Sequence, residues 1–305
     1  MIFHYLKIAF RNLYKHKTQN IISIIGLAVG LLCFCVCIYC SRFVESTDHC
    51  FTNHDRIAEL NLYDGKTDRY FSGSPVPLAE DLRTWSLGET EAISSVTYPR
   101  ERPYYVELSP EKMLPYELET IEIDTCYNKI FTPEMVAGHW KMASQSLNSV
   151  ILSQSMAIKI FGNAESAIGK HMTLMRRLNT SPESTPKTGG IVYTIQAVMK
   201  DIPLNNSLDF MQNIDMLTVN DSEGLLQSSK RHNMTGANTY VLLSPQTTCT
   251  DLEKQFLKRD YTYTLYGEAY TVTASSMGAR LKKQGASYLG LVTGTVGTLI
   301  LLVGL

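Results

Sequence analysis

The feature that most constrains this chain is an uninterrupted stretch of uncharged residues near its N-terminus. Residues 20–41 read NIISIIGLAVGLLCFCVCIYCS and contain no Asp, Glu, Lys or Arg. Because an α-helix rises about 1.5 Å per residue, roughly 20 such residues cross the ~30 Å hydrocarbon core of a bilayer. The sequence therefore predicts a transmembrane helix over residues 20–41.

A cleaved secretion signal is the main alternative for this run. The run is longer than the roughly 7–15 apolar residues of a signal-peptide core, and no A-x-A-like cleavage site follows it. Cys40 would suggest lipidation, but Tyr39 before it is bulky where lipoprotein signals carry a small residue. The sequence therefore favours an uncleaved membrane anchor.

The charges ahead of the run predict its orientation. Lys7, Arg11, Lys15 and Lys17 precede it, and no acidic residue does. Because basic flanks remain on the cytoplasmic side of a membrane, we expect the N-terminus in the cytoplasm and residues 42–285 outside it.

Residues 1–19 also have the pattern of an amphipathic helix. Lys7, Arg11 and Lys15 fall on the face opposite an apolar one, which predicts a cytoplasmic helix lying in the lipid headgroup region. The alternative is that these charges only set the topology. The apolar face consists of Phe3, Leu6, Phe10 and Leu13.

A second uncharged run, residues 284–305, ends the sequence. We expect residues 286–305 to begin a second transmembrane helix whose far end is missing, so that the chain is a fragment. Each apolar run contains one GxxxG pair, and small residues at this spacing let helix backbones approach closely. We therefore expect helix–helix packing at Gly26 and Gly30, and at Gly290 and Gly294.

The region between the runs is predicted to be an α+β domain. We expect mixed sheets with short helices, in two lobes, flanked by the transmembrane helices. Asp64-Gly65 is typical of a hairpin turn, residues 74–85 of a capped amphipathic helix and residues 251–260 of another helix. The expected strands contain SSVTY, PYYVEL, ETIEID, SVIL, IVYTIQAVM, MQNIDMLTV, NTYVLLS and YTVTA.

The segment GNAESAIGK superficially resembles a phosphate-binding loop. A Walker loop has four residues between its glycines and a Ser or Thr after its lysine, whereas six residues separate Gly162 from Gly169 and no hydroxyl residue follows Lys170. We therefore interpret it as a structural corner after a helix that Ser153 caps and Gly162 ends. The inward residues of that helix are predicted to be Met156, Ile160 and Phe161.

Catalytic, metal and cofactor signals are weak. The histidines are scattered without close metal-ligand spacing, and we expect no catalytic residue, metal or cofactor. The pairs Glu117/Glu119 and Glu122/Asp124 alternate along strands, which favours a solvated face. With 28 basic and 29 acidic residues, the chain has no nucleic-acid-binding signature.

Seven cysteines divide into two groups. Those within residues 33–40 lie inside the first apolar run, where small apolar side chains fill space and zinc ligation would be costly. Cys50, Cys126 and Cys249 lie outside, where a disulfide could form, but three cysteines cannot all pair internally and the sequence does not say which would.

The order of these motifs resembles the MacB-like (FtsX-like) permease family of ABC transporters. The matching stretches are KIAFRNLYKHK, GLAVG, ESTDHCFTNHDRIAEL, YNKIFTPEMVAGHW, NSVILSQSMAIKIFGNAESAIGK and YTIQAVMKDIPLNNSLDF. The family's motif outside the first membrane helix falls on Glu45, Ser46, Asp48, Phe51, Asp55, Arg56 and Ile57.

The resemblance implies a non-enzymatic permease subunit in a bacterial inner membrane, with a MacB-like periplasmic core domain. It also implies a cytoplasmic ABC ATPase as partner and a permease that works as a homodimer or as a pair of related permeases. The substrate that is exported or extracted would be a lipoprotein, a peptide or a toxic small molecule. ATP hydrolysis would move the periplasmic domain through the membrane helices. The alternatives are a membrane-anchored sensor domain and an envelope scaffold that regulates cell-wall hydrolases.

If a displacement of the first membrane helix is to reach the domain outside the membrane, the junction between them has to be stiff, because a flexible linker would absorb the displacement. We expect Phe51 and Ile57 to pack under the domain, and Asp48 or Asp55 to pair with Arg56 or Arg42.

Overall fold

The computed structural model divides the chain into two compact units. Residues 48–279 form one, here called the sheet domain, and residues 1–47 with 280–305 form the other. Several predicted features lie outside the described residues: the apolar face of the N-terminal helix, Lys7, Gly290, Gly294 and the second expected transmembrane helix at residues 286–305. The structure describes residues 11, 15, 17–71, 73–85, 87–109, 112–146, 148–174, 190–209, 211–220, 237–265, 267–279, 281–283 and 285.

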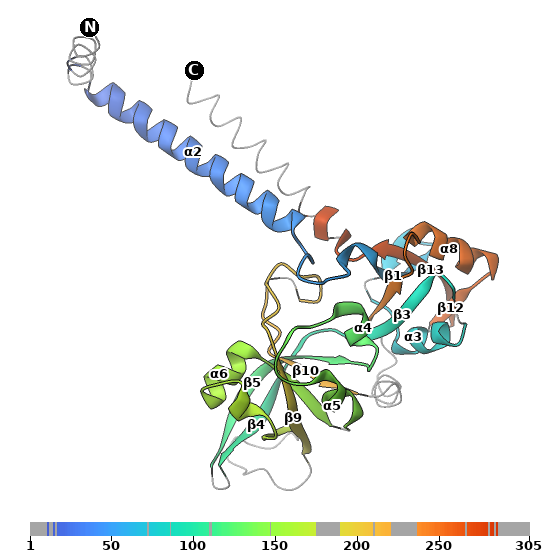
Figure 1. The fold of residues 1–305 in the computed structure, drawn as a ribbon. Coiled ribbons are helices and arrows are strands. Elements are labelled where there is room, and N and C mark those ends of the chain that lie inside the picture. Colours follow the sequence, from blue (N-terminus) through green and yellow to red (C-terminus); the bar gives the residue numbers. More distant parts are fainter. Residues whose placement is uncertain are drawn as a thin grey trace. The chain divides into compact units, whose positions relative to one another are not determined.

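The smaller unit contains one long helix, α2 (Lys17–Glu45) (Figure 1). By length and composition α2 could cross a membrane, and none of its residues is buried by the protein. α2 extends past the predicted boundary at residue 41 because no Gly or Pro follows Ser41 before Glu45. The positive charge of Arg42 in its last turn also stabilises the negative C-terminal end of the helix dipole. Gly26 has open space where a side chain would be, whereas Gly285 lies against Val44.

The first lobe of the sheet domain gathers strands from both ends of its sequence. Hydrogen bonding runs in the order β3, β11, β1, β13, β12, all antiparallel, and β2 pairs with β1 through the turn predicted at Asp64-Gly65. Two helices, α3 and α8, contribute to its core. Its elements are β1 (Ile57–Asp64), β2 (Arg69–Phe71), α3 (Val76–Arg83), β3 (Thr90–Thr97), β11 (Ala237–Leu243), α8 (Cys249–Lys258), β12 (Thr262–Leu265) and β13 (Glu268–Ser276).

The second lobe is a closed ring of strands. The order β10, β7, β9, β8, β4, β5 closes because β10 also pairs with β5, and β6 adds to β9. Two of these pairings, β7–β9 and β10–β5, are parallel, so the predicted mixed sheet is confirmed. Its elements are β4 (Arg100–Ser109), β5 (Lys112–Ile123), β6 (Met135–Gly138), α5 (Trp140–Gln145), β7 (Ser149–Ser153), α6 (Gln154–Phe161), η2 (Glu165–Ala167), β8 (His171–Leu174), β9 (Ile191–Met199) and β10 (Met216–Val219).

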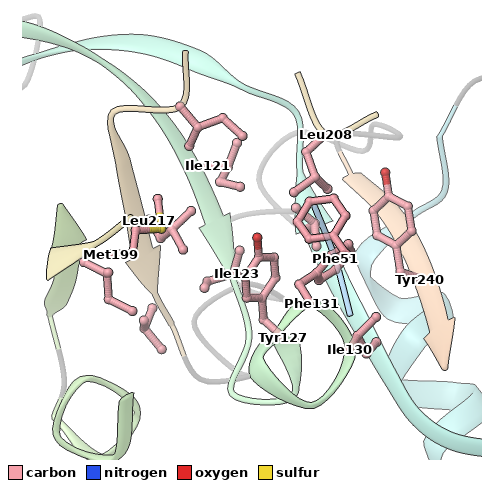
Figure 2. Close-up of a cluster of buried hydrophobic side chains, with 14 of the residues drawn as sticks. Phe51, Ile121, Ile123, Tyr127, Ile130, Phe131, Met199, Leu208, Leu217 and Tyr240 are labelled. Atoms are coloured by element: carbon pink, nitrogen blue, oxygen red, sulfur yellow. The ribbon is translucent and has the colours of Figure 1, made fainter. Parts of the chain in front are cut away.

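Successive side chains of a strand point to opposite faces of the sheet, and this alternation divides the buried residues into separate clusters. In β7, Val150 and Leu152 join a cluster with α6, while Ile151 faces a second cluster. This second cluster draws side chains from both lobes and from α4 (Tyr127–Phe131), and we call it the shared core (Figure 2). Direct strand pairing between the lobes in the described chain is one register pair, Val96 with Ile123.

Two local expectations are corrected. Ser74 does not cap the helix that follows: α3 begins after Pro75 without a side-chain cap, and the Ser74 hydroxyl lies 2.6 Å from that of Thr239. Glu122 and Asp124 do not lie on a solvated face, because both are buried. Each is in an ion pair, Glu122 with Arg102 and Asp124 with Arg83.

The segment GNAESAIGK forms the corner that its sequence predicts. The Ser153 hydroxyl accepts the Met156 amide at 3.3 Å and caps α6, and Gly162 ends the helix at φ 87°. Asn163 accepts the Ser166 amide at 2.7 Å, and the Gly169 amide donates to the carbonyl oxygen of Ile195 at 2.8 Å. Met156 and Ile160 are buried as predicted, whereas Phe161 is only half-buried.

This corner can be tested by two substitutions. Lys170→Ala is expected to change the free energy of unfolding by less than ~0.5 kcal/mol, because the lysine is exposed. Gly162→Val should cost more, at least ~1 kcal/mol, because a β-branched residue is strained at positive φ. Urea unfolding measures both. Binding of ATP to the protein, abolished by Lys170→Ala, would contradict the structural interpretation.

Candidate functional site

The candidate site is the edge of the sheet domain where the chain enters and leaves it. Phe51 and Ile57 follow the entry point and are both buried in the shared core, as predicted. The Phe51 ring meets Phe131 edge-on at 5.0 Å, and Phe131 meets Tyr240 at 5.2 Å in the same way. Figure 2 shows Phe51 close to Phe131, Leu208 and Tyr240. The entry segment is thereby anchored in the core that joins the two lobes.

Asp48 is the most buried charged group at this edge, with 1% of its surface exposed. Its carboxylate accepts hydrogen bonds from the Ser207 amide at 2.6 Å and the Ser207 hydroxyl at 2.5 Å. Its own amide donates to the carbonyl oxygen of Asn205 at 2.9 Å. Asp48 has φ 70°, a left-handed conformation that Asp and Asn tolerate better than most side chains. The two hydrogen bonds from Ser207 end on a charged carboxylate, and short bonds to a charged group are stronger than bonds between neutral groups.

The loop that meets Asp48 is held in shape by its own side chains. The Asn206 side chain accepts the amides of Leu208 at 3.0 Å and Asp209 at 2.9 Å, and it donates to the carbonyl oxygen of Pro203 at 2.6 Å. Leu208 is buried in the shared core. The Asn205–Ser207 backbone is therefore presented to Asp48 by a preformed turn.

The exit of the chain from the domain lies against the same carboxylate. The Met277 amide donates to the carbonyl oxygen of Ile57 at 2.9 Å, which continues the pairing of β13 with β1. At Gly278, φ is 72°, and an added Cβ would collide with the Asp48 carboxylate and approach the Ser207 hydroxyl to 2.9 Å. Only glycine fits here. Entry, exit and loop thus converge on Asp48.

Arg56 stabilises the start of β1, but through a partner that we did not predict. Its guanidinium donates twice to the carbonyl oxygen of Leu243, at 2.9 and 2.7 Å, and pairs with Glu91 at 2.7 Å. Asp55 is largely exposed and lies 3.3 Å from the His54 ring. The expected pairing of Arg56 with Asp48 or Asp55 is therefore wrong, because Arg56 points across the sheet to β11 and β3.

The cysteine beside this site is chemically quiet. Desolvation by the surrounding protein, with the charge of Asp48 adding to it, raises the pKa of Cys50 to about 11, although the side chain keeps an exposed edge. Because the thiolate is the nucleophile, a raised pKa keeps the Cys50 side chain in its less reactive thiol form near neutral pH. All seven cysteines lie in the described part of the chain and are free, Cys126 and Cys249 included.

A second surface feature is an acidic groove of about 400 Å³ in the second lobe. Burial raises the pKa of Asp215, and burial with the charges of Asp209, Glu101 and Asp215 raises that of Glu119. Within the described residues, no three His, Cys, Asp or Glu side chains are placed to hold a metal. We assign no ligand to the groove, which is lined by Glu101, Glu117, Glu119, Ser155, Met156, Lys159, Gln212, Asn213 and Asp215.

Three residues of this edge, Ser207, Gly278 and Glu91, were not predicted from the sequence. The run DIPLNNSLDF carries a turn signal in its adjacent asparagines and serine, which could have marked Ser207 as part of an ordered loop. Its partner Asp48 lies 159 positions away, and nothing local to either residue identifies the pair.

Comparison with known proteins gives structural likeness without sequence matches. No protein-family model and no curated protein match the chain. A crystallised domain of a protein designated a permease from Porphyromonas gingivalis is similar at a TM-score of 0.55 and 20% identity, covering 74% of this chain and 93% of that one.

Two further structures have TM-scores below 0.5. The periplasmic region of MacB from Actinobacillus actinomycetemcomitans has a TM-score of 0.47 and 14% identity, covering 76% of this chain and 92% of that one. The extracellular domain of the noncanonic ABC-type transporter YknZ from Gram-positive bacteria has a TM-score of 0.42 and 12% identity, covering 72% and 99%. The chain therefore shares the fold of the Porphyromonas gingivalis domain, and the predicted α+β class is confirmed.

Proposed function

We propose that the chain is the permease subunit of an ABC transporter of the MacB-like type. In this proposal α2 spans the bacterial inner membrane, the sheet domain lies in the periplasm, and a cytoplasmic ABC ATPase supplies the energy. The subunit is not itself an enzyme, binds no cofactor and works as a homodimer or a pair of related permeases. Its cargo is a lipoprotein, a peptide or a toxic small molecule that it exports or extracts.

The observation that carries the proposal is the anchored entry of the chain into a domain of permease fold. Phe51 and Asp48 come within six residues of the end of α2 at Glu45, and both are buried in the sheet domain. In a transporter driven from the cytoplasm, this arrangement lets a displacement of the helix reach the domain core without being absorbed by a flexible linker.

The experiment that tests the proposal is purification of the full-length protein from its native membranes in a mild detergent. We expect an ABC ATPase to co-purify and the complex to hydrolyse ATP. Hydrolysis should disappear when the Walker lysine of the ATPase is changed, because the permease does not hydrolyse ATP itself. Recovery of a signalling kinase or a cell-wall hydrolase, with no ABC ATPase, would contradict the proposal and favour the sensor or the scaffold.

A further inference from the structure

We propose that Asp48 is a positioning residue whose carboxylate latches the second lobe of the sheet domain to the point where the chain enters and leaves the first. The latch consists of Asp48, Ser207 and Gly278. Its use in transport rests on the function proposed above. Its role in holding the lobes does not depend on any ATPase.

The lobes are joined by little backbone pairing. Among the described strands, β3 and β5 meet at the single pair Val96–Ile123, which is where the sheet passes from one lobe to the other. Close to this point, Asp124 at the end of β5 binds Arg83 of α3 and accepts from Ser94 of β3 at 2.8 Å. Backbone pairing thus ties the lobes at one register pair, and side-chain bonds and the shared core supply the rest of the contact.

The latch is a separate tie between the same lobes. Asp48 and Gly278 flank the first lobe at its two ends, before β1 and after β13. Ser207 lies in the loop between β9 and β10, both strands of the second lobe. The two hydrogen bonds from Ser207 to the carboxylate therefore link the second lobe to the entry and exit of the first.

The chemistry of the latch suits a contact that opens and closes. An aromatic core contact weakens gradually with separation, whereas a hydrogen bond is lost over about 1 Å of displacement and its groups can then bond to water. Gly278 leaves the space that the carboxylate and the Ser207 hydroxyl occupy, and a side chain at this position would displace them. Movement of the entry segment thus acts on the loop through Asp48.

Ser207→Ala tests the latch with the smallest change to the fold, because it removes only the hydroxyl donor. The matched control is Ser244→Ala, which removes a hydroxyl bonded at 2.8 Å to the carbonyl oxygen of Gly88. Both residues of this control contact belong to the first lobe, at the ends of β11 and β3. In the full-length protein in nanodiscs, hydrogen exchange of the 204–209 amides should speed up about tenfold in Ser207→Ala and stay unchanged in Ser244→Ala.

The relative position of the lobes gives a second readout. Spin labels on unnatural residues at 158 in α6 and 258 in α8, both exposed positions, report the distance between the lobes. We expect the distance distribution to broaden in Ser207→Ala and in Asp48→Ala but not in Ser244→Ala. Asp48→Asn should restore much of the narrow distribution, because Asn tolerates the positive φ and keeps one carbonyl acceptor.

Unchanged exchange at 204–209 and an unchanged distance distribution in Ser207→Ala would overturn the latch. It would equally be overturned if Asp48→Ala left the distribution as narrow as in the unchanged protein, since the carboxylate would then not be what positions the lobe. These measurements need no ATPase. Failure to find an ATPase would refute the proposed function and leave the latch standing.

Discussion

Replacing Asp124 by alanine is expected to destabilise the sheet domain by about 3–5 kcal/mol, a large share of the stability of a typical domain. Asp124 is 1% exposed and binds the Arg83 guanidinium. It also accepts from the Ser95 amide at 2.9 Å and the Cys126 amide at 3.0 Å. Alanine would remove the buried carboxylate that faces the Arg83 guanidinium, which keeps Glu80 and the carbonyl oxygen of Ile93, and would take the acceptor from both amides.

The measurement is urea unfolding followed by tryptophan fluorescence. Both tryptophans, Trp85 and Trp140, lie in the sheet domain, so the signal reports that domain even in the full chain. The matched control is Glu80→Ala, which removes the exposed partner of the same Arg83 and should cost at most ~1 kcal/mol. A loss below ~1 kcal/mol for Asp124→Ala would show that the buried pair does not hold the lobes together.

Phe51→Ala is expected to cost about 3–5 kcal/mol in the same assay, because it leaves a cavity in the shared core beside Phe131. Phe51→Leu should cost less than about 1.5 kcal/mol, since it fills most of the volume. Phe51 therefore has a stabilising role that an ordinary solvated linker residue would not have.

The control for Phe51 is an apolar residue on the surface. Leu257 of α8 is 69% exposed, and Leu257→Ala should change the stability by no more than ~0.5 kcal/mol. If Phe51→Ala were as mild as Leu257→Ala, the entry segment would be loosely attached to the domain. The mechanical interpretation of the junction would then be wrong.

Local signals in the sequence predicted the parts of the fold that local chemistry determines. The β9 run IVYTIQAVM is apolar, β-branched and bounded by turn residues, and it forms a strand over the predicted residues. Ser153 and Gly162 fix the two ends of α6 within eleven residues of one another, so both were readable. The α8 helix begins slightly earlier than predicted, where Thr248 and Asp251 form a capping box.

Pairings between distant residues were not predictable from a single sequence. The alternating acids of ETIEID are typical of a strand with one face in water, but this end of β5 pairs with β10 and meets β3, so Glu122 and Asp124 are covered. Ser74 satisfied the pattern of a helix cap, yet the buried hydroxyl of Thr239, 165 residues away, is its partner instead. In each case tertiary contacts overrode a valid local preference.

The proposed function requires that a displacement of α2 reaches the sheet domain through a stiff junction. Inserting Gly-Ser-Gly-Ser after Thr47 would place a flexible linker just ahead of Asp48, where the sheet domain begins. The matched control is the same insertion after Lys66, in the exposed turn between β1 and β2. The domain itself should fold in both variants, because neither insertion disrupts its core.

The deciding measurement is hydrogen exchange of the sheet domain in the full permease–ATPase complex, with and without ATP. We expect ATP to change the protection of residues 204–209 in the native complex and in the Lys66 insertion. After the Thr47 insertion, ATP hydrolysis should persist while this change disappears. If the change survives the Thr47 insertion at full size, motion does not pass through this junction, and rigid coupling of the membrane helix to the sheet domain is contradicted.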